Sequence, residues 1–232
     1  MKKCYIFFFI LFSTFYLPAQ SYNITYIQKD IIDNSEVDKL DLPESAKELY
    51  KKGIKQRQKT RFYYTLKYTN GNSMYTFLKV EQAHKTLTIS STTTYKNQKK
   101  GEMYTTGGMM REDEAIKRNI KKNYNWIFEN ETKSILGYKC QKAYYINDSK
   151  IKTTVWYAIK IPIMDGPSIY AGVPGLILQV ETNRAIITAS KIDKNINEEQ
   201  VKIPNFKQFT TPESYRKLFI QKAKKKEVKK NK

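Results

Sequence analysis

The sequence is poor in the side chains that most often build catalytic and metal centres. It contains one histidine, His84, and two cysteines among 232 residues. A Ser-His-acid or Cys-His arrangement would have to use His84, which lies in EQAHKT (81–86), a segment typical of the loop after a hairpin strand. Zinc sites draw on several Cys and His ligands, and the mature chain keeps too few to fill one alone. A phosphate-binding glycine loop is also missing, so we expect no catalytic residue, no metal and no cofactor.

Cysteine is too scarce for an internal disulfide. Cys4 lies in the N-terminal leader, which leaves only Cys140 in the mature chain. An odd thiol in an exported protein can be reactive, can pair between chains, or can be buried, and burial is the ordinary outcome. On an extended strand Cys140 shares a face with Lys142, whose charge would favour the thiolate, but also with Tyr138 and Tyr144, which indicate a packed interior. Cys140 is therefore a candidate reactive thiol only.

Long apolar runs are limited to one. Tyr5–Leu17 follows Lys2 and Lys3 and has about 13 residues, whereas a membrane-spanning helix needs roughly 20. With a small residue, Ala19, after Pro18, this pattern predicts a signal peptide over residues 1–19 that is cleaved near Ala19; an uncleaved anchor is the alternative. We expect an exported protein, periplasmic or secreted, that is soluble after cleavage.

Acidic residues are outnumbered by basic ones. The formal net charge is +20, of which Lys2 and Lys3 contribute two that would leave with the leader. The end of the chain, KAKKKEVKKNK (222–232), is dense in lysine and is expected to be a disordered basic tail. Such a surface attracts anionic membranes or acidic glycans, although a merely solvated lysine-rich surface is the alternative. Export argues against nucleic acid as a partner.

Aromatic and β-branched residues predict a sheet. Eighteen tyrosines and eleven phenylalanines favour strands. The clearest hairpin covers 61–80 and turns at Asn70-Gly71, a dipeptide that accepts positive φ. We expect a single domain over 20–221 of mainly β (α+β) class, a curved antiparallel sheet or half-barrel of about six to nine strands with two or three helices. Further strands are expected at 85–95, 99–106, 123–130, 133–146, 150–161, 173–181 and 184–193.

Three segments have helical signals. Residues 43–59 place Ala46, Leu49 and Ile54 at helical spacing after a proline. A second helix is expected to begin at 211–213 and to run into the basic tail. A third, short helix is expected over 111–122, because it has acids at its start and bases at its end.

Carboxylates are present but do not form a recognisable pair. Glu112, Asp113 and Glu114 could hold a cation, yet at consecutive helical positions they are better explained as a dipole-stabilising first turn. Glycosidases use two carboxylates, and Glu129, Glu131 and Asp165 are available. Nothing in their spacing selects two of them, and their expected partners are Lys133 and other surface cations.

One segment carries a family resemblance. NWIFENETKSILGYKCQKA (125–143), VWYAIKIPIMDGPSIYAG (155–172) and VPGLILQVE (173–181) resemble, in order, the core of the GLPGLI family of exported bacterial proteins. The signature stands here as Gly172, Val173, Pro174, Gly175, Leu176 and Ile177, with Val in place of the first Leu. The resemblance implies an exported, β-rich protein without an established activity, and it brings no catalytic residues.

The same six residues also have a structural interpretation. Two glycines flank Pro174, which fixes one φ, so the chain can turn sharply before it enters an apolar strand. Leu176, Ile177 and Leu178 are consecutive, which indicates a strand covered on both faces. The motif is therefore either a folding device or part of a ligand-facing groove.

Three functions are compatible with this sequence. The favoured one is a non-enzymatic periplasmic or envelope protein that binds an apolar ligand or peptide in the concavity of its sheet, with aromatic strands at 61–80 and 124–157 as the surface. The alternative is an envelope interaction protein whose basic tail contacts an anionic membrane or an outer-membrane partner. The third is an unrecognised hydrolase. The identity of any partner is not encoded in a recognisable motif.

Overall fold

The computed structural model describes residues 21–39, 41–81, 92–108, 110–120, 124–194, 201–215 and 217. The predicted signal peptide with Cys4, the loop with His84 and the lysine-rich tail at 222–232 lie outside the described residues. Their predicted roles stay predictions.

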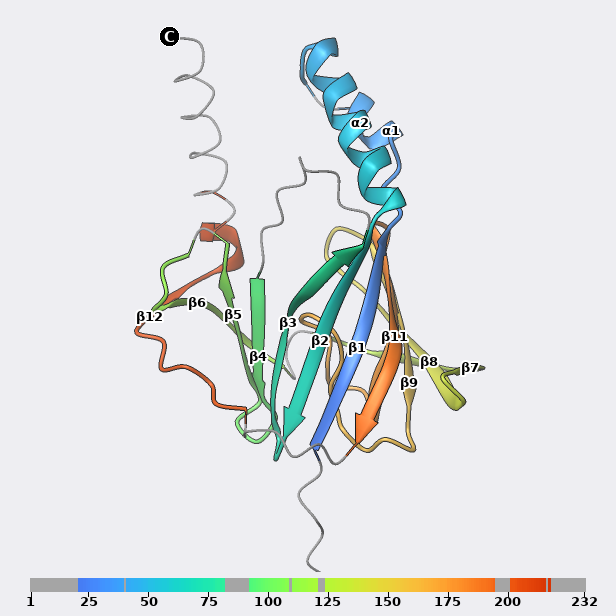
Figure 1. Cartoon of the computed structure of the whole chain (residues 1–232), viewed down its shortest axis with the longest axis vertical. Coiled ribbons are helices and arrows are strands. Elements are labelled where there is room, and N and C mark those ends of the chain that lie inside the picture. Colours follow the sequence, from blue (N-terminus) through green and yellow to red (C-terminus); the bar gives the residue numbers. More distant parts are fainter. Residues whose placement is uncertain are drawn as a thin grey trace, which may run out of the picture.

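The described chain forms one twelve-stranded sheet, with the order β12-β6-β5-β4-β3-β2-β1-β11-β10-β9-β8-β7 (Figure 1). All neighbours are antiparallel except β12 and β6, which pair in parallel over three residues. The sheet is open, with β12 and β7 at its edges. The strands are β1 (Ser21–Asp30), β2 (Arg61–Thr69), β3 (Asn72–Glu81), β4 (Thr92–Asn97), β5 (Glu102–Gly107), β6 (Glu114–Asn119), β7 (Ile127–Ile135), β8 (Tyr138–Ile146), β9 (Lys152–Ala158), β10 (Leu176–Glu181), β11 (Ala185–Lys194) and β12 (Gln208–Thr210).

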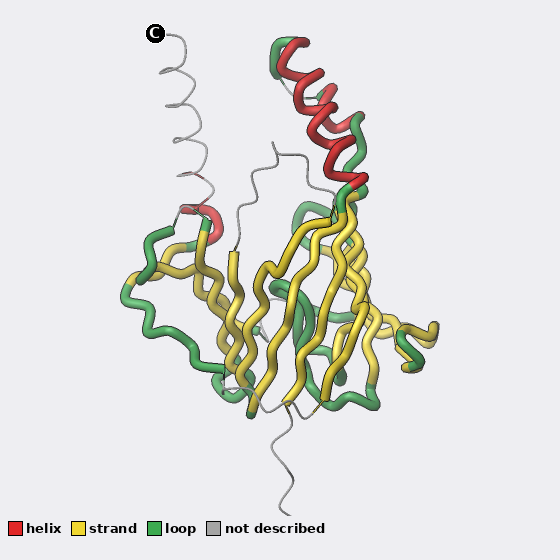
Figure 2. The backbone as a smooth tube through the Cα atoms, in the orientation of Figure 1, coloured by secondary structure: helices red, strands yellow, loops and turns green. Residues whose placement is uncertain are grey.

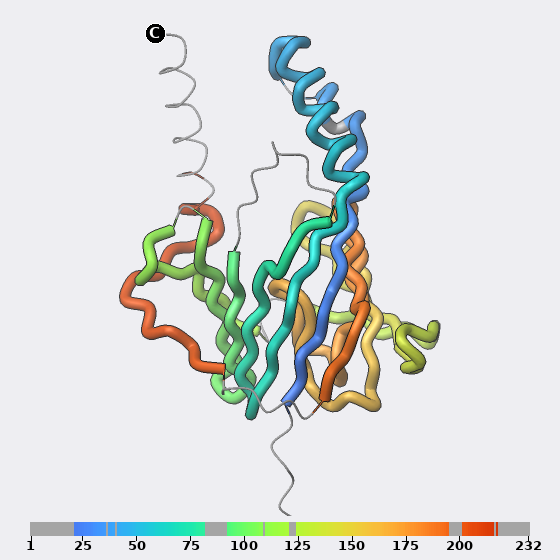
Figure 3. The backbone as a smooth tube through the Cα atoms, viewed as in Figure 1, coloured from blue at the N-terminus to red at the C-terminus, as the bar shows by residue number. Residues whose placement is uncertain are grey.

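The predicted mainly β class is confirmed, but the predicted architecture is wrong. The structure has an open, mixed sheet of twelve strands with two short labelled helices in its described part, not a half-barrel of six to nine strands with two or three helices. Two strands were not predicted from the sequence. β1 follows the predicted leader and lies between β2 and β11 at the centre of the sheet (Figure 3). β12 is only three residues long.

The predicted helix over 111–122 is wrong. Residues Glu114–Asn119 form β6, where Ala115 and Ile116 are buried and Ile116 pairs with Thr105 of β5. Sheet pairing and burial outweigh the weak helical preference of the isolated segment, because propensity contributes only tenths of a kcal/mol per residue. Near the C-terminus, residues 212–215 are helical, as predicted, and most of the remainder of that predicted helix lies outside the described residues.

The predicted helix over 43–59 is confirmed as α2 (Glu44–Lys59), which follows the short α1 (Ser35–Asp38). The two helices project beyond the end of the sheet instead of covering a face of it (Figure 1). No residue of α2 is buried, and Leu49 and Tyr50 are exposed. The side chain of Arg57 donates to Asp30 at 2.7 Å and so fixes the base of α2 to β1.

Two tight turns join neighbouring antiparallel strands, one near the centre of the sheet and one at its β7 edge. Asn70 and Gly71 have φ values of +53° and +87°, so the predicted turn between β2 and β3 is confirmed. Leu136 and Gly137 have φ values of +50° and +77° and join β7 to β8. The expected strand over 133–146 is therefore two strands, with the turn inside it.

The main core lies on the inner face of the central strands. It contains Ile24 and Tyr26 of β1, Leu66 of β2 and Leu178 of β10, all fully buried. The loop between β9 and β10, residues 159–175, folds back into this interior (Figure 2), and Ile161, Ile163 and Val173 pack in the same cluster. The inside of the curved sheet is thus largely filled by the chain itself.

Candidate functional site

The loop 159–175 is held in place by its own backbone and by the strand that follows it. The N–H of Gly172 donates to the carbonyl of Met164 at 3.1 Å, and the N–H of Leu176 donates to that of Ile161 at 3.0 Å. The N–H of Ile177 donates to the carbonyl of Asp165 at 2.8 Å. Because these bonds satisfy buried backbone groups, the loop is a fixed part of the interior.

A buried ion pair ties this loop to β4. The Nζ of Lys96 lies 2.6 Å from Oδ1 of Asp165 and 2.6 Å from the carbonyl oxygen of Gly166, and both side chains of the pair are inaccessible. Burial lowers the pKa of Lys96, and the carboxylate of Asp165 opposes that shift. Asp165, a candidate carboxylate for catalysis, is therefore held in a buried ion pair with Lys96.

The six-residue motif at 172–177 leads from the loop into β10. Val173, Leu176 and Ile177 are fully buried, whereas Pro174 is exposed. A Cβ at Gly175 would lie 2.4 Å from the carbonyl oxygen of Ala158, so only glycine lets the loop pass so close to the end of β9. Five of the six motif positions therefore serve the turn and the core.

Gly172, the first motif residue, has a different environment. Its φ is +91°, and a Cβ there would lie 3.7 Å from Nε1 of Trp126 and 3.9 Å from Cγ2 of Ile120. The absent side chain leaves space between these two residues. Gly172 is the motif residue that lines a pocket.

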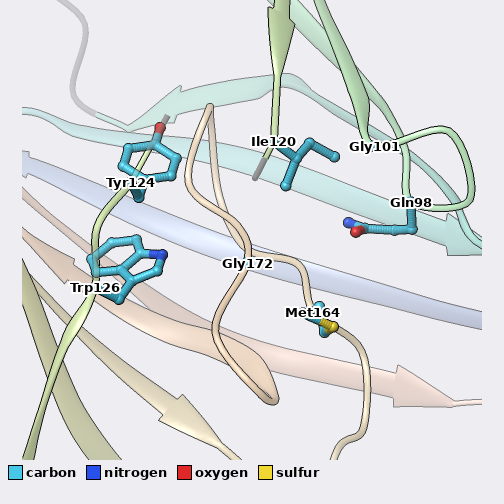
Figure 4. A pocket seen from close by; sticks show the side chains of 7 residues that line it. All are labelled: Gln98, Gly101, Ile120, Tyr124, Trp126, Met164 and Gly172. Carbon is cyan, nitrogen blue, oxygen red and sulfur yellow. The ribbon is translucent and has the colours of Figure 1, made fainter. Parts of the chain in front are cut away.

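This pocket has a volume of about 280 Å³ and lies beside the loop (Figure 4). Its wall is contributed by the β4–β5 turn, the segment after β6, the segment before β7, and the loop 159–175, which are distant in sequence. The lining residues are Gln98, Gly101, Ile120, Tyr124, Trp126, Met164 and Gly172.

Two aromatic rings form one side of the pocket. Tyr124 and Trp126 stack with ring centroids 5.0 Å apart and an interplanar angle of 28°. Tyr145 packs edge-on against both, at 4.9 and 5.2 Å. The Trp126 Nε1–H donates to the carbonyl of Ala171 at 3.0 Å, and this bond and the packing hold the rings in fixed orientations.

Burial raises the pKa of Tyr124 well above the usual tyrosine value. Its hydroxyl therefore stays protonated at neutral pH, and it donates to the carbonyl of Ile169 at 3.0 Å. The pKa of Tyr170, which lies 6.0 Å from Tyr124, is raised for the same reason. These tyrosines are packed rings whose hydroxyl groups are protonated at neutral pH.

Gln98 supplies the one side-chain amide of the lining. Its backbone N–H donates to the carbonyl of Gly71 at 2.8 Å, which fixes the residue at the β4–β5 turn. Its Nε2 atom is buried and has no hydrogen-bond partner among the described residues. Figure 4 shows the amide at the tip of a side chain that points toward the Gly172 segment. An unpaired buried donor is costly, so an acceptor at this position would be stabilising.

Cys140 lies away from this pocket, in the interior next to β7 and β9. The residue is buried, and its Sγ lies 3.5 Å from the carbonyl oxygen of Tyr138. Burial raises the pKa of the Cys140 thiol to about 11, and the smaller effect of Lys133 does not reverse it. At neutral pH the group is a thiol, which is a poor nucleophile.

The other candidate carboxylates pair with lysines on the surface. Glu129 and Glu131 both contact the Nζ of Lys142, at 2.9 and 2.5 Å. The expected partner Lys133 instead contacts Glu181, at 3.1 Å.

The acidic run of residues 112–114 does not form a helix turn. Asp113 forms an exposed pair with Arg111 at 3.7 Å, and Glu114 begins β6. In the described part of the chain, no group of three His, Cys, Asp or Glu side chains is placed to hold a metal ion. Within that same part, no helix is long and apolar enough to cross a membrane.

The segment 124–157, predicted to supply ligand-facing aromatics, contains Tyr124 and Trp126. No sequence pattern pointed to Gln98, Ile120 or Met164. These residues carry no local signal, because the pocket forms only when four separate segments meet.

The fold and the site together define a β-sheet domain with a small, uncharged, aromatic-lined pocket. Residues 65–217 match the family model described as the N-glycanase peptide, N-terminal domain (PNGase_F-II_N). The match covers more than half of the chain, and the protein belongs to this family.

Two solved structures of PNGF-II have a similar fold. The structure in the P21 space group gives a TM-score of 0.54 at 18% identity and covers 86% of this chain and 33% of that chain. The structure in the C2 space group gives a TM-score of 0.50 at 20% identity and covers 86% of this chain and 32% of that chain. The protein thus spans about a third of the length of these PNGF-II chains. No curated protein matches the sequence.

The resemblance to the GLPGLI family is therefore wrong as a family assignment, because the matching family model is a different one. Within the segment that carried the resemblance (125–143, 155–172 and 173–181), Val173, Leu176 and Ile177 are buried, and Gly175 passes a backbone carbonyl closely. These residues serve the turn into β10.

Proposed function

We propose that this protein is a non-catalytic carbohydrate-recognition domain that binds glycans through the pocket beside Trp126. The observation that carries the proposal is a fixed pair of stacked rings, Tyr124 and Trp126, lining a pocket in a member of the N-glycanase N-terminal domain family. A pyranose presents a face of C–H groups that packs on an aromatic ring. Rigid aromatic surface of this kind binds at low entropic cost.

Two features support binding over catalysis. The family match is to an N-terminal domain, and the chain covers about a third of the PNGF-II structures. The three carboxylates that were candidates for a glycosidase pair are each bound to a lysine: Asp165 to Lys96, and Glu129 and Glu131 both to Lys142. Hydrolysis by this chain is the less favoured candidate.

The proposal changes where a ligand is expected. The sequence favoured an apolar ligand or peptide in the broad concavity of the sheet, but the loop 159–175 occupies much of that space. The pocket at Trp126 lies at the margin of this loop. We also propose, from the leader at residues 1–19, that the protein acts after export. N-terminal sequencing of the native protein would show whether cleavage occurs near Ala19.

Binding can be measured through Trp126 itself. The chain has two tryptophans, and Trp156→Phe leaves Trp126 as the only one. In this variant, addition of a mixture of released N-glycans should change the emission of Trp126 with saturation. The Trp126→Ala variant should bind the same glycans at least about tenfold more weakly, as expected for a central aromatic anchor.

The matched control is Phe128→Ala. Phe128 lies on β7, two residues after Trp126, and is exposed outside the pocket lining. Its removal should leave glycan affinity unchanged. A glycan array without signal for the wild-type protein, or equal losses in the Trp126 and Phe128 variants, would overturn the proposed function.

A further inference from the structure

We propose that the projecting helix α2 is a docking surface for an anionic lipid membrane, which it contacts through three lysines and a leucine on its exposed side. This inference goes beyond glycan binding, because no residue of α2 lines the pocket at Trp126. It follows from the exposure of the helix, from its charge and from the way it is fixed to the sheet.

The helix α2 leaves its apolar side chains in solvent. No residue is buried along its sixteen positions, and Figure 1 shows the helix standing beyond the end of the sheet. The side chain of Leu49 is 71% exposed and that of Tyr50 is 57% exposed. A Cβ added at Gly53, one turn further along, would meet no atom within 4 Å. A surface helix normally packs its apolar side chains against the core, so this helix lacks a partner for them.

Three lysines lie on the same side of α2 as Leu49. Lys52, Lys55 and Lys59 are exposed and follow Leu49 at steps of three, three and four residues, which keeps them together on a helix. Glu48 is also exposed on this side, and the lysines outnumber it. The side therefore combines an excess of positive charge with one exposed apolar side chain.

The other cations of α2 are already used within the protein. Each forms an ion pair with a carboxylate: Lys47 with Glu44, Lys51 with Asp38 and Arg57 with Asp30. Among the residues that the structure describes, Lys52, Lys55 and Lys59 have no ion-pair partner of this kind. These three lysines are the ones that an external anion can reach.

The base of the helix is fixed, and the same end of the sheet has a similar surface. Arg57 donates to Asp30 at 2.7 Å and holds α2 against the end of β1. Ile31, directly after β1, is exposed, and so are Lys29 and Arg61, which are register partners on β1 and β2. The helix and this end of the sheet thus present basic and apolar side chains together.

A membrane fits this surface better than another protein does. A stable protein interface buries roughly 800 Å² on each partner, with an apolar centre that one leucine and one tyrosine do not supply. A second copy related by two-fold symmetry would bring the same lysines face to face, and their charges would repel. An anionic bilayer attracts each lysine near its surface and accepts leucine and tyrosine side chains at the level of the headgroups.

The test measures co-sedimentation of the exported protein with lipid vesicles. Vesicles of phosphatidylcholine mixed with phosphatidylglycerol present an anionic surface, and vesicles of phosphatidylcholine alone are the neutral comparison. At low salt the protein should bind the anionic vesicles at least about tenfold more tightly than the neutral ones. Salt at about 0.5 M should remove most of this preference, because it screens the charges.

Two changes on α2 separate its charge from its apolar side chain. The triple variant Lys52→Glu, Lys55→Glu and Lys59→Glu should weaken binding to anionic vesicles by at least about tenfold. Leu49→Ser keeps the charge and should weaken binding by about three- to tenfold, because the leucine no longer enters the headgroup region. Circular dichroism checks that each variant folds, and Leu49→Ser alters only one exposed side chain if the triple variant does not.

The matched control changes the net charge by the same amount away from α2. Lys139→Glu, Lys160→Glu and Lys202→Glu replace three exposed lysines on β8, in the loop 159–175 and before β12. This variant should bind anionic vesicles within about threefold of the wild type, because these lysines lie outside the docking surface. The lysine-rich segment 222–232 is the same in every variant, so it does not contribute to the comparison.

Each outcome decides the inference. Losses confined to the α2 variants support it. Equal losses in the two triple variants would show that overall charge governs binding and would overturn it, as would full binding by the α2 variants. Capture of an acidic protein by α2 without any binding to anionic vesicles overturns the membrane as the partner. The α2 variants should keep the glycan affinity of the wild type, so failure here leaves the proposed function untouched.

Discussion

Lys96 and Asp165 form an ion pair of 2.6 Å in which neither side chain is accessible to solvent. The two residues are 69 positions apart in the sequence and join β4 to the loop 159–175. The same loop provides Met164 and Gly172 to the candidate glycan pocket. The pair thus fixes the position of the loop and, through it, the shape of the pocket.

We expect Lys96→Met and Asp165→Asn to lower the free energy of unfolding by different amounts. Lys96→Met leaves the Asp165 carboxylate buried without its cation and should lower the free energy of unfolding by about 3–5 kcal/mol. Asp165→Asn should cost less. Lys96 keeps the carbonyl oxygens of Gly166 and Tyr170 as acceptors, and burial already lowers its pKa, which favours the neutral amine. Urea unfolding followed by tryptophan fluorescence measures both.

An exposed pair provides the control for this comparison. Lys117 and Glu102 lie 2.7 Å apart on the surface, and Lys117→Met should leave the free energy of unfolding almost unchanged because solvent screens the pair. Similar costs for Lys96→Met and Lys117→Met would contradict a structural role for the buried pair.

Two glycine-to-alanine substitutions should change the stability of the protein in opposite directions. At Gly175 a Cβ would lie 2.4 Å from the carbonyl oxygen of Ala158, so Gly175→Ala should destabilise the fold by at least about 2 kcal/mol. At Gly53 of α2 nothing lies within 4 Å, and Gly53→Ala should stabilise the helix by about 0.5–1 kcal/mol. Thermal denaturation monitored by circular dichroism tests both. A neutral Gly175→Ala would show that the loop can move away from β9.

The thiol of Cys140 should be unreactive in the native protein. It is buried, and burial raises its pKa to about 11, so at pH 8 almost no thiolate is present. Maleimide should label Cys140 slowly until denaturant is added. Fast labelling of the folded protein at pH 8 would contradict this prediction and would restore Cys140 as a candidate reactive thiol.

The raised pKa of the Cys140 thiol also predicts that the stability of the protein depends on pH. A pKa raised on folding means that the native state holds the proton more tightly than the unfolded state. The contribution of the protonated Cys140 thiol to the free energy of unfolding is fully present below about pH 9. It is lost as the pH rises toward about 11. The difference in unfolding free energy between the wild type and Cys140→Ala should therefore narrow over this interval.

Arg57 is expected to control the mobility of α2. It donates to the buried Asp30 at 2.7 Å, and its guanidinium lies 4.7 Å from the ring centre of Phe62. Arg57→Ala removes both contacts, and we expect faster hydrogen exchange over 44–59 with little change in the central strands. Lys52→Ala, on the same helix but exposed, is the control. Unchanged exchange in the Arg57 variant would show that α2 is held by other contacts.

Local signals account for the features that the sequence predicted correctly. Asn70-Gly71 can adopt two positive φ values in succession, and this chemistry fixes the β2–β3 turn wherever the hairpin lies. The apolar spacing in 43–59 likewise gives α2 without help from the sheet, with which it makes few contacts. Both elements depend on neighbours within a few residues.

Predictions from the sequence were wrong where contacts with residues far away in the chain determine the secondary structure. Residues 111–122 have helical signals, but Ile116 pairs with Thr105, and the edge pairing of β6 with β12 joins segments about 94 residues apart, Glu114 and Gln208. The helical signals of this segment are local, and only the neighbouring strands β5 and β12 decide that it is extended.

By itself, the sequence determined the mainly β class, the hairpin turn at Asn70-Gly71 and the helix at 43–59, because turn chemistry and residue periodicity act over a few positions. The tertiary structure alone decided the twelve-strand order, the buried contact of Lys96 with Asp165 and the meeting of Gln98, Trp126 and Met164 around one pocket. These contacts join segments far apart in the chain. Their free energy depends on burial and distance in the folded state, which no local pattern of residues encodes.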